Sequence, residues 1–265
     1  MTVVLPPGTV LQQMYLKERL AAIPAGRFIE VGTGQGQLSR LLLNAGWTGT
    51  GYDLNPESLA CARVANAEAI QAGRYDLQCG NWLETLPNQP ADLILSCMVL
   101  EHLDDTDEAR YFEQCKAHLK PGGRIVLLVP GSPAHWGVED DIAGHFRRYS
   151  RESLSRALQR SGLRCEHMAG LTYPVSNLLL PVSNWLVSRQ ESQKKALSQR
   201  EQTRQSGNRK VLFKTTFPSL LKGVLNETVM FPCHLLQKAM RNHPHALVLF
   251  AECVIDHEVE PKEPL

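Results

Sequence analysis

The sequence predicts an α/β fold whose sheet is mostly parallel. Within residues 25–170, short apolar stretches of strand type alternate with longer stretches of helical periodicity. Parallel strands need long crossover connections, which helices usually provide, so this alternation favours a parallel sheet. A glycine-rich loop follows the first apolar stretch, at the end of a strand, where ligands of such sheets bind.

The expected secondary structure follows this alternation along the core. A helix comes first, over residues 9–22, with Thr9 and Gln12 as a capping box. The strands of the core are expected at residues 27–31, 48–54, 74–79, 91–98, 124–130 and 162–171. The helices between them are expected at residues 36–46, 56–71, 105–119 and 151–161. Residues 131–150 show neither periodicity and are expected to form a loop over the ligand-binding edge.

Four segments are expected along the chain. They are residues 1–24 with the N-terminal helix, 25–170 with the sheet core, 171–245 with a helical insertion, and 246–265 with the final strand and a loose tail. The last strand is expected at residues 246–255. Within the insertion, Pro174 and Pro181 are expected to interrupt an apolar stretch, because proline breaks helical hydrogen bonding.

Composition and charge set limits on location and partners. The chain has 265 residues, 43% of them hydrophobic, with 28 basic and 27 acidic residues and a formal charge of +1. This balance gives no general attraction to nucleic acids, so no nucleic-acid partner is expected. Seven cysteines without a CxxC pair argue against a zinc site and are typical of a reduced, cytoplasmic protein. With no signal-peptide pattern and no apolar run of about 18 residues, no membrane-spanning helix is expected.

The loop after the first strand contains three glycines at alternate positions, Gly32, Gly34 and Gly36. A loop that binds a nicotinamide dinucleotide has the pattern GxGxxG and holds a pyrophosphate at the start of the next helix. Here the third glycine comes one residue earlier, and Glu30 lies just before the loop. Because a carboxylate would repel a pyrophosphate and suits a cationic group, a nicotinamide-dependent dehydrogenase is disfavoured.

Asp53 ends the second expected strand. A carboxylate at this place can accept hydrogen bonds from both hydroxyls of a ribose. Together, Asp53 and Glu30 indicate a ligand that has a ribose and a cationic end but no phosphate. S-adenosylmethionine fits this description.

The sequence resembles the class I S-adenosylmethionine-dependent methyltransferases over about residues 25–170, and residues 246–255 match the family's final strand. Five stretches in the family's order carry the resemblance: "EVGTGQG", "GYDLNP", "CGNW", "ADLILSCMVLEHL" and "LKPGGRIVLLVP". The resemblance implies a Rossmann-like three-layer sandwich with a seven-stranded, mostly parallel sheet. The last strand would run antiparallel, and the helical insertion would lie between the last two strands.

The resemblance also implies which residues bind the cofactor. Glu30 and the glycine loop would hold the methionine end, Asp53 the ribose, and Leu54 would lie against the adenine. Asn81 stands where the family often has an acid, and its side-chain oxygen can still accept a hydrogen bond from the adenine amine. Trp82 is expected either beside the cofactor or in the core. The expected set is Glu30, Gly32, Thr33, Gly34, Gly36, Asp53, Leu54, Asn81, Trp82 and Cys97.

Two histidines are the expected catalytic residues, His102 after the fourth strand and His145 after the fifth. The sulfonium is already an activated methyl donor, so a base is needed only for an acceptor that carries a proton. For His102, a role in bracing the next helix stays open. His145 lies beside Arg147, Arg148 and Tyr149, and this cluster can either bind an anionic or polar acceptor or brace a loop onto the sheet. The stretch "EHL" also resembles ubiquinone-type O-methyltransferases, some of which use acidic residues with a metal. No metal is expected here, with Glu101 and His102 as the alternative ligands.

The insertion is expected to cover the acceptor site. Four of its apolar residues share one helical face: Leu178, Val182, Trp185 and Leu186. Residues 188–210 hold seven basic and two acidic residues, a net charge of +5. A lid with a solvated basic loop explains these features, and so does a segment that lies on a membrane. The hypothesis is a lipid-linked acceptor and peripheral contact with the inner membrane surface through residues 171–245.

The predicted function is methyl transfer from S-adenosylmethionine to a small-molecule or lipid-linked acceptor, at oxygen, by in-line displacement. N- or C-methylation and a non-catalytic module that binds S-adenosylmethionine remain alternatives. A nucleic-acid methyltransferase is disfavoured because no N/D-P-P-Y/F motif follows the fourth strand, where the sequence reads "SCMVLEHL". The sequence leaves the oligomeric state open.

Overall fold

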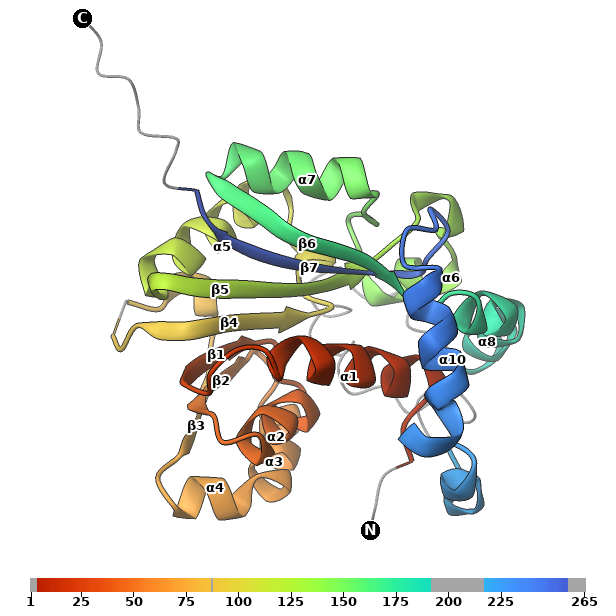
Figure 1. Cartoon of the computed structure of the whole chain (residues 1–265), viewed down its shortest axis with the longest axis horizontal. Helices are drawn as coiled ribbons and strands as arrows, with labels where there is room; N and C mark the ends of the chain where they lie inside the picture. Colours follow the sequence, from red (N-terminus) through yellow and green to blue (C-terminus); the bar gives the residue numbers. More distant parts are fainter. Residues whose placement is uncertain (1–3, 87, 192–216, 257–265) are drawn as a thin grey trace, which may run out of the picture.

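A computed structural model describes residues 4–86, 88–191 and 217–256. Its strands are β1 (Arg27–Val31), β2 (Thr48–Asp53), β3 (Tyr75–Cys79), β4 (Ala91–Cys97), β5 (Leu119–Pro130), β6 (Leu163–Leu171) and β7 (Val248–Ile255). They form one seven-stranded sheet in the order β3-β2-β1-β4-β5-β7-β6 (Figure 1). β7 pairs antiparallel with β5 and β6, and the remaining pairs are parallel. The predicted sheet, with its antiparallel last strand, is confirmed.

Helices connect the strands and cover both faces of the sheet. They are α1 (Pro7–Leu20), α2 (Gln37–Asn44), α3 (Pro56–Ala65), α4 (Ala67–Gln71), α5 (Asp105–His118), α6 (Val138–Ala143), α7 (Arg151–Arg160), α8 (Val175–Glu191) and α10 (Glu227–Ala239). Short 3₁₀ helices are η1 (Trp82–Glu84), η2 (Leu100–His102), η3 (Pro133–His135) and η5 (Ser219–Gly223).

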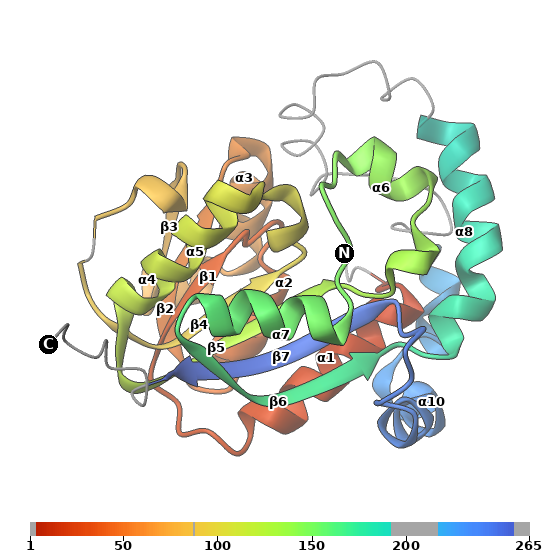
Figure 2. The ribbon, with the colours of Figure 1, turned by 90° about the horizontal axis from the view of Figure 1, so that it is seen from above.

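The hydrophobic core lies in two layers, one on each face of the sheet (Figures 1 and 2). On one face, Phe112 of α5 and Leu158 of α7 are buried against the sheet. On the other, Leu16 of α1 and Leu42 of α2 are buried. β4 and β5 are apolar on both faces, as expected for central strands that helices cover on both sides. The three-layer sandwich is therefore confirmed, and α1 is part of one of its layers.

Three local expectations were wrong. The first helix begins at Pro7 after Pro6, without a side-chain cap, so Thr9 and Gln12 form no capping box. Proline suits this place because its missing N–H would have no partner in the first turn. The helix expected at 56–71 breaks at Asn66, whose side chain donates to the carbonyl of Ala62 and competes with the helical backbone. Residues 131–150 contain α6 within the expected loop.

Pro181 does not end α8, contrary to expectation, because the helix runs from Val175 to Glu191. The proline removes one backbone hydrogen bond, but side-chain packing holds both halves. Val187 is buried against Ile142 of α6. Contacts with α1 hold α8 as well.

The helical insertion lies between β6 and β7, as predicted. In both views α8 and α10 lie at the end of the molecule where the parallel strands have their carboxyl ends (Figures 1 and 2). Most of the basic stretch at 188–210 falls outside the residues that the structure describes. Within the described residues, no helix is long and apolar enough to cross a bilayer.

Candidate active site

A large cavity of about 1380 Å³ opens at the carboxyl ends of the parallel strands. It is bounded by the loops after β1, β2 and β4, by α1 and by the inner side of α8. Eleven of the twelve predicted site residues line it: Glu30, Gly32, Thr33, Gly34, Asp53, Leu54, Asn81, Trp82, Cys97, His102 and His145. Gly36 is the exception, and it lies outside the cavity lining.

The glycine loop bends sharply because all three glycines have positive φ angles, +73° at Gly32, +52° at Gly34 and +77° at Gly36. A Cβ atom at Gly32 would lie 2.5 Å from the side chain of Val99, whereas one at Gly34 would meet nothing within 4 Å. Gly34 therefore leaves open space where the loop borders the cavity, which suits a ligand that approaches the backbone.

Gly36 has a packing role in this structure. A Cβ atom there would lie 2.5 Å from Asn66 and 2.9 Å from the Cβ of Ala62, so the glycine lets α2 start close against α3. The asparagine side chain also donates to the Gly36 carbonyl at 3.0 Å. The structure thus gives this glycine a contact within the fold and leaves it outside the cavity lining.

We expect Gly36→Ala to lower the free energy of unfolding by about 2–4 kcal/mol, since backbone strain and overpacking add. Gly73→Ala is the matched control, because Gly73 also has a positive φ (+67°) but no atom within 4 Å of a Cβ. It should lose only the strain, about 1–2 kcal/mol. Urea denaturation of both variants measures the difference, and equal losses would contradict the packing role.

Glu30 lies at the base of the cavity and is only 2% exposed. Its Oε2 atom accepts hydrogen bonds from the hydroxyls of Ser39 and of Thr33, the latter at 3.1 Å. The Tyr75 hydroxyl joins the same buried network. Burial, the largest cause, raises the pKa of Glu30 from 4.5 to about 7, against these hydrogen bonds. A cationic ligand group would compensate this buried carboxylate.

Asp53 ties the second strand to the glycine loop. Its Oδ2 accepts from the backbone N–H of Gly34 at 2.7 Å, and its Oδ1 accepts from that of Asn55 at 2.8 Å. Burial raises its pKa, while the backbone hydrogen bonds act in the opposite direction. Each carboxylate oxygen has a further lone pair, so the side chain can still accept from ligand hydroxyls in the cavity.

The side chain of Asn81 is used within the protein. Its oxygen accepts from the N–H of Leu83 at 3.1 Å and caps η1, and its amide donates to Glu84 at 2.8 Å. The cap fixes Asn81 at the rim of the cavity. An adenine amine would have to share the oxygen with the helix cap.

Trp82, Leu54 and Cys97 line the cavity in different ways. The ring of Trp82 is 3% exposed and packs at 5.3 Å from that of Tyr111, so this side chain belongs to the core and to the cavity wall at once. Leu54 is 52% exposed at the rim. The Cys97 thiol is buried beside the cavity, and burial raises its pKa far above its ordinary value.

His145 is held in place by a buried carboxylate. Its Nδ1 lies 2.8 Å from Asp140, which is fully buried and also accepts from the Nε of Arg148 at 2.8 Å and from the N–H of Gly137 at 2.8 Å. Although burial would raise the pKa of Asp140, hydrogen bonding from His145 and the charge of Arg148 hold it below 3.8. Because the ionised carboxylate only accepts, the Nδ1 of His145 carries the proton and its Nε2 is left as an acceptor.

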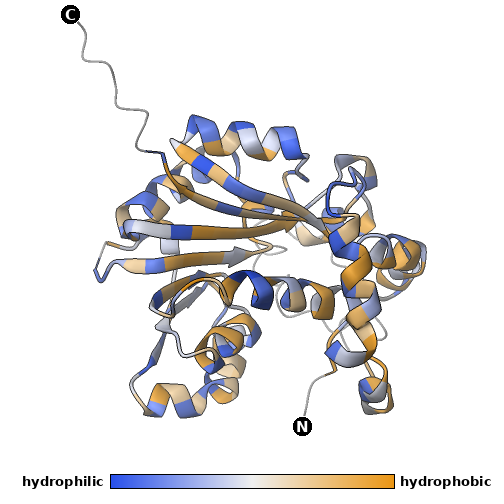
Figure 3. Cartoon of the chain, in the orientation of Figure 1, coloured by the Kyte–Doolittle hydropathy of each residue, from blue (hydrophilic) through white to orange (hydrophobic). Residues whose placement is uncertain are grey.

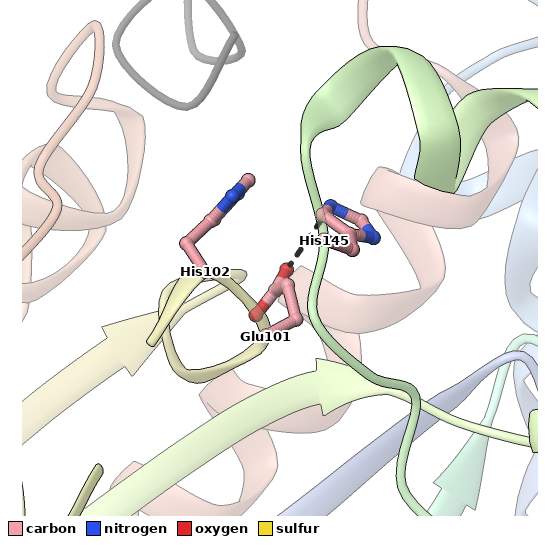
Figure 4. A group of neighbouring side chains, drawn as sticks. All are labelled: Glu101, His102 and His145. Atoms are coloured by element: carbon pink, nitrogen blue, oxygen red, sulfur yellow. Dashed lines mark ion pairs between the residues drawn. The ribbon is translucent and has the colours of Figure 1, made fainter. Parts of the chain in front are cut away.

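The Nε2 atom of His145 faces Glu101 and His102 at the cavity wall (Figure 4). Glu101 lies 3.9 Å away, and the two histidine rings meet edge to face at 4.7 Å. Burial, the largest cause, raises the pKa of Glu101 to about 8, so its carboxyl group is protonated at neutral pH. One ligand atom from each of the three residues falls within 4.8 Å of the others, a geometry that also suits a metal ion.

The neighbours of His145 brace the loop. Arg147 donates to the carbonyl of Leu103 at 3.0 Å, and Arg148 is paired with Asp140. The hydroxyl of Tyr149 donates to Glu108 at 2.5 Å. These contacts favour the bracing interpretation of this cluster over direct binding of an anionic acceptor.

Residues 12–168 match a family described as "Methyltransferase domain". This match spans more than half of the chain. The chain belongs to this methyltransferase family. The protein is therefore an S-adenosylmethionine-dependent methyltransferase, which confirms the prediction.

Individual relatives of this methyltransferase agree with that assignment. The chain is 28% identical over 172 residues to a "Ubiquinone biosynthesis O-methyltransferase" of Xylella fastidiosa, covering 60% of this chain and 69% of the relative. It shares its fold with the glycopeptide N-methyltransferase MtfA (TM-score 0.51, 19% identity, 63% of this chain and 88% of the other). The mitomycin 7-O-methyltransferase MmcR is similar (TM-score 0.50, 23% identity, 62% and 51%). At these identities the structures show the fold alone.

The part of the cavity that Glu30, Gly34 and Asp53 line fits S-adenosylmethionine. A bound S-adenosylmethionine supplies an activated methyl group, and its ammonium group would balance the buried Glu30. The open space at Gly34 and the carboxylate of Asp53 border the same part of the cavity. Apolar side chains of α1 and α8 form part of the remaining wall.

We expect Glu30→Gln to weaken S-adenosylmethionine binding by about 10- to 100-fold, because a charge-assisted hydrogen bond is lost. The native protein should bind more tightly as pH rises through about 7, where Glu30 ionises, and the variant should not.

Because the folded-state pKa of Glu30 is raised, its carboxyl group contributes stability below pH 4.5 that is lost as pH rises through about 7. The variant should therefore gain stability relative to the native protein above that pH. Calorimetric titration and thermal unfolding at several pH values measure both effects, and pH-independent native binding would contradict the role.

Two features of this methyltransferase site escaped prediction from sequence. Asp140 was not singled out, because it is one of three consecutive acidic residues in an expected loop. The pairing of Asp140 with His145 depends on the turn at the end of α6. The contribution of α1 to the cavity wall, through Gln12 and Leu16, was also missed. The amphipathic pattern of α1 predicts a helix but not where it docks.

Proposed function

We propose that the enzyme methylates a hydroxyl oxygen of a small molecule with an apolar body, free or lipid-linked. The acceptor oxygen attacks the methyl carbon in line with the departing sulfur. An O–CH₃ bond forms as the CH₃–S⁺ bond breaks, S-adenosylhomocysteine leaves, and the hydroxyl proton passes to the Nε2 of His145. Aligned geometry alone supplies roughly 7–11 kcal/mol in such reactions.

The observation that carries this proposal is the Asp140–His145 pair. The carboxylate fixes the proton on Nδ1 and leaves the Nε2 lone pair at the cavity wall. A base in this position is useful for an acceptor that must lose a proton, such as a hydroxyl group. A neutral amine already has a free lone pair for the attack, so it depends less than a hydroxyl group on a base such as His145.

The apolar half of the cavity supports an acceptor with an apolar body. Its wall holds a group of aliphatic and aromatic side chains: Leu5, Leu16, Leu179, Leu180, Val182, Leu186, Phe217 and Leu247. Pockets of this composition bind through burial of apolar surface, with a few polar groups that fix orientation. The relatives that are ubiquinone biosynthesis O-methyltransferases support such an acceptor and oxygen as the methylated atom.

Product analysis tests the proposal. The full chain is incubated with S-adenosylmethionine labelled in its methyl group and with matched pairs of apolar phenols and apolar amines. We expect label in O–CH₃ groups, which NMR distinguishes from N–CH₃ and C–CH₃ groups. Label at nitrogen or carbon would replace the proposal with the corresponding methyltransferase. Tight cofactor binding without any turnover would identify a non-catalytic module.

We expect methyl transfer to persist after treatment with EDTA, because the activated sulfonium and the His145 base need no Lewis acid. The measurement is turnover before and after dialysis against the chelator. Loss of activity that Mg²⁺, Mn²⁺ or Zn²⁺ restores would instead assign Glu101, His102 and His145 as metal ligands.

A further inference from the structure

We propose that the outer faces of α8, η5 and α10 form a surface that docks on an anionic lipid bilayer. This lid surface consists of Leu178, Leu179, Val182, Trp185, Leu220, Val224, Val229, Phe231, Leu235 and Leu236. The inference does not depend on which atom of the acceptor receives the methyl group.

The lid surface concentrates the exposed apolar side chains of the protein. Among the described residues, fifteen large apolar side chains are exposed. Nine of them belong to these three elements, and a tenth, Val224, directly follows η5. Leu178 is 77% exposed and Leu220 is 91% exposed. Single exposed apolar residues are ordinary, but a group of this size marks a surface that contacts another apolar phase.

The helix α10 buries two polar side chains beside Met230 and exposes several apolar ones. Its buried side includes His234 and Gln237, which are 1% and 0% exposed. His234 bonds to Glu18 at 2.8 Å, and Gln237 donates to the carbonyl of Leu11 at 2.9 Å. Phe231 and its neighbours Leu235 and Leu236 are turned outward instead, although burying them would have stabilised the fold in water.

The outer side of α8 has the composition of a membrane interface. Val187 packs inward against α6, whereas Leu178 and Trp185 are exposed. The guanidinium of Arg189 lies 5.5 Å from the centre of the Trp185 ring, a cation–π contact. Tryptophan and basic residues are enriched at the boundary between lipid and water. Figure 3 shows apolar residues along both α8 and α10. Both helices lie at the same end of the molecule (Figures 1 and 2).

The lid surface continues into the cavity. Leu179 and Val182 are exposed and also line the cavity, so the exposed apolar residues of α8 extend from the lid surface to the cavity. An apolar acceptor that leaves a bilayer at this surface would pass along α8 to the active site without crossing water. Docking here would therefore place the cavity opening against the lipid.

The charge of the chain favours a bilayer over a second copy of the protein. In the sequence, residues 188–210 begin in the last turn of α8 and precede η5, and they carry a net charge of +5. Two copies that associated through the lid surface would each carry this positive charge, which opposes their association. An anionic leaflet attracts basic residues beside an apolar surface, each by about 1 kcal/mol near the surface.

Vesicle flotation with the full chain tests the proposal. Vesicles of phosphatidylcholine alone are compared with vesicles that also contain phosphatidylglycerol. We expect binding to the anionic vesicles, reduced by added salt. Trp185→Ser and Phe231→Ser should each weaken it by about tenfold, since both remove apolar area that enters the interface. Val64→Ser is the matched control, because Val64 is 81% exposed on α3 and outside the lid surface.

Neither Trp185 nor Phe231 lines the large cavity, so S-adenosylmethionine affinity should stay unchanged in both variants and serves as the check on folding. Absence of native binding to anionic vesicles would overturn the proposal. Equal binding by native and variant proteins would overturn it too. A native dimer that the same two variants convert to monomers would assign the surface to a second copy instead.

Discussion

His145→Gln is expected to lower kcat by about 10²–10⁴-fold, because proton transfer by a positioned base contributes that much. The affinity for S-adenosylmethionine should stay unchanged, since the contacts of His145 are with Asp140, Glu101 and His102. Steady-state turnover with a phenolic acceptor and calorimetric titration of the cofactor measure the two quantities separately.

His135→Gln is the matched control for this prediction. His135 lies in the same loop and is hydrogen-bonded to Ser132 at 2.7 Å, but it does not line the cavity. Its substitution should leave kcat within about twofold of the native value, as for a surface change away from the site. Full turnover in His145→Gln would show that the acceptor loses its proton without a protein base.

Asp140→Ala is expected to lower the free energy of unfolding by about 3–5 kcal/mol, the usual loss when one partner of a buried ion pair is removed. Arg148, whose side chain is 8% exposed, would be left as an uncompensated buried charge, and His145 would lose the group that fixes its tautomer. Turnover should therefore fall together with stability. Urea denaturation and steady-state kinetics measure the two effects.

Asp140→Asn separates these two effects, because it keeps the shape of the side chain and removes its charge. The asparagine oxygen can still accept one hydrogen bond, so kcat should fall while the stability loss stays smaller than for alanine. The pKa of Asp140 is depressed, so its contribution to stability is present above pH 3.8 and is lost as pH falls below that value. A native protein whose stability is flat through this range would contradict the ionised state of Asp140.

The sheet and its order could be predicted because they depend on local patterns. Continuous apolar runs such as residues 91–97 are typical of buried parallel strands, and the alternation with helices restricts the connections between them. The cofactor side of the cavity was equally predictable. Glu30 and Asp53 lie in the last residues of β1 and β2, and Gly34 follows β1. The carboxyl ends of the parallel strands meet at one edge of the sheet, where all three residues line the cavity.

Residues in irregular segments were harder to predict, because their role depends on what they meet across the fold. Gly36 and Gly34 look alike in sequence, but only tertiary packing gives one a neighbour in α3 and leaves the other open. Pro181 predicts a helix end, yet α8 continues because α6 and α1 pack against it. Asn81 serves as a helix cap as well as a cavity residue.

The sequence by itself determined the sheet, the family and the cofactor, because hydrophobic periodicity and the glycine loop encode them over short distances. Only the tertiary structure decided that Asp140 holds His145 in one tautomer beside Glu101, and that α8 and α10 turn apolar side chains outward. The physical reason is that a side chain's pKa, tautomer and exposure are set by partners distant in sequence. No local pattern specifies those partners before the chain has folded.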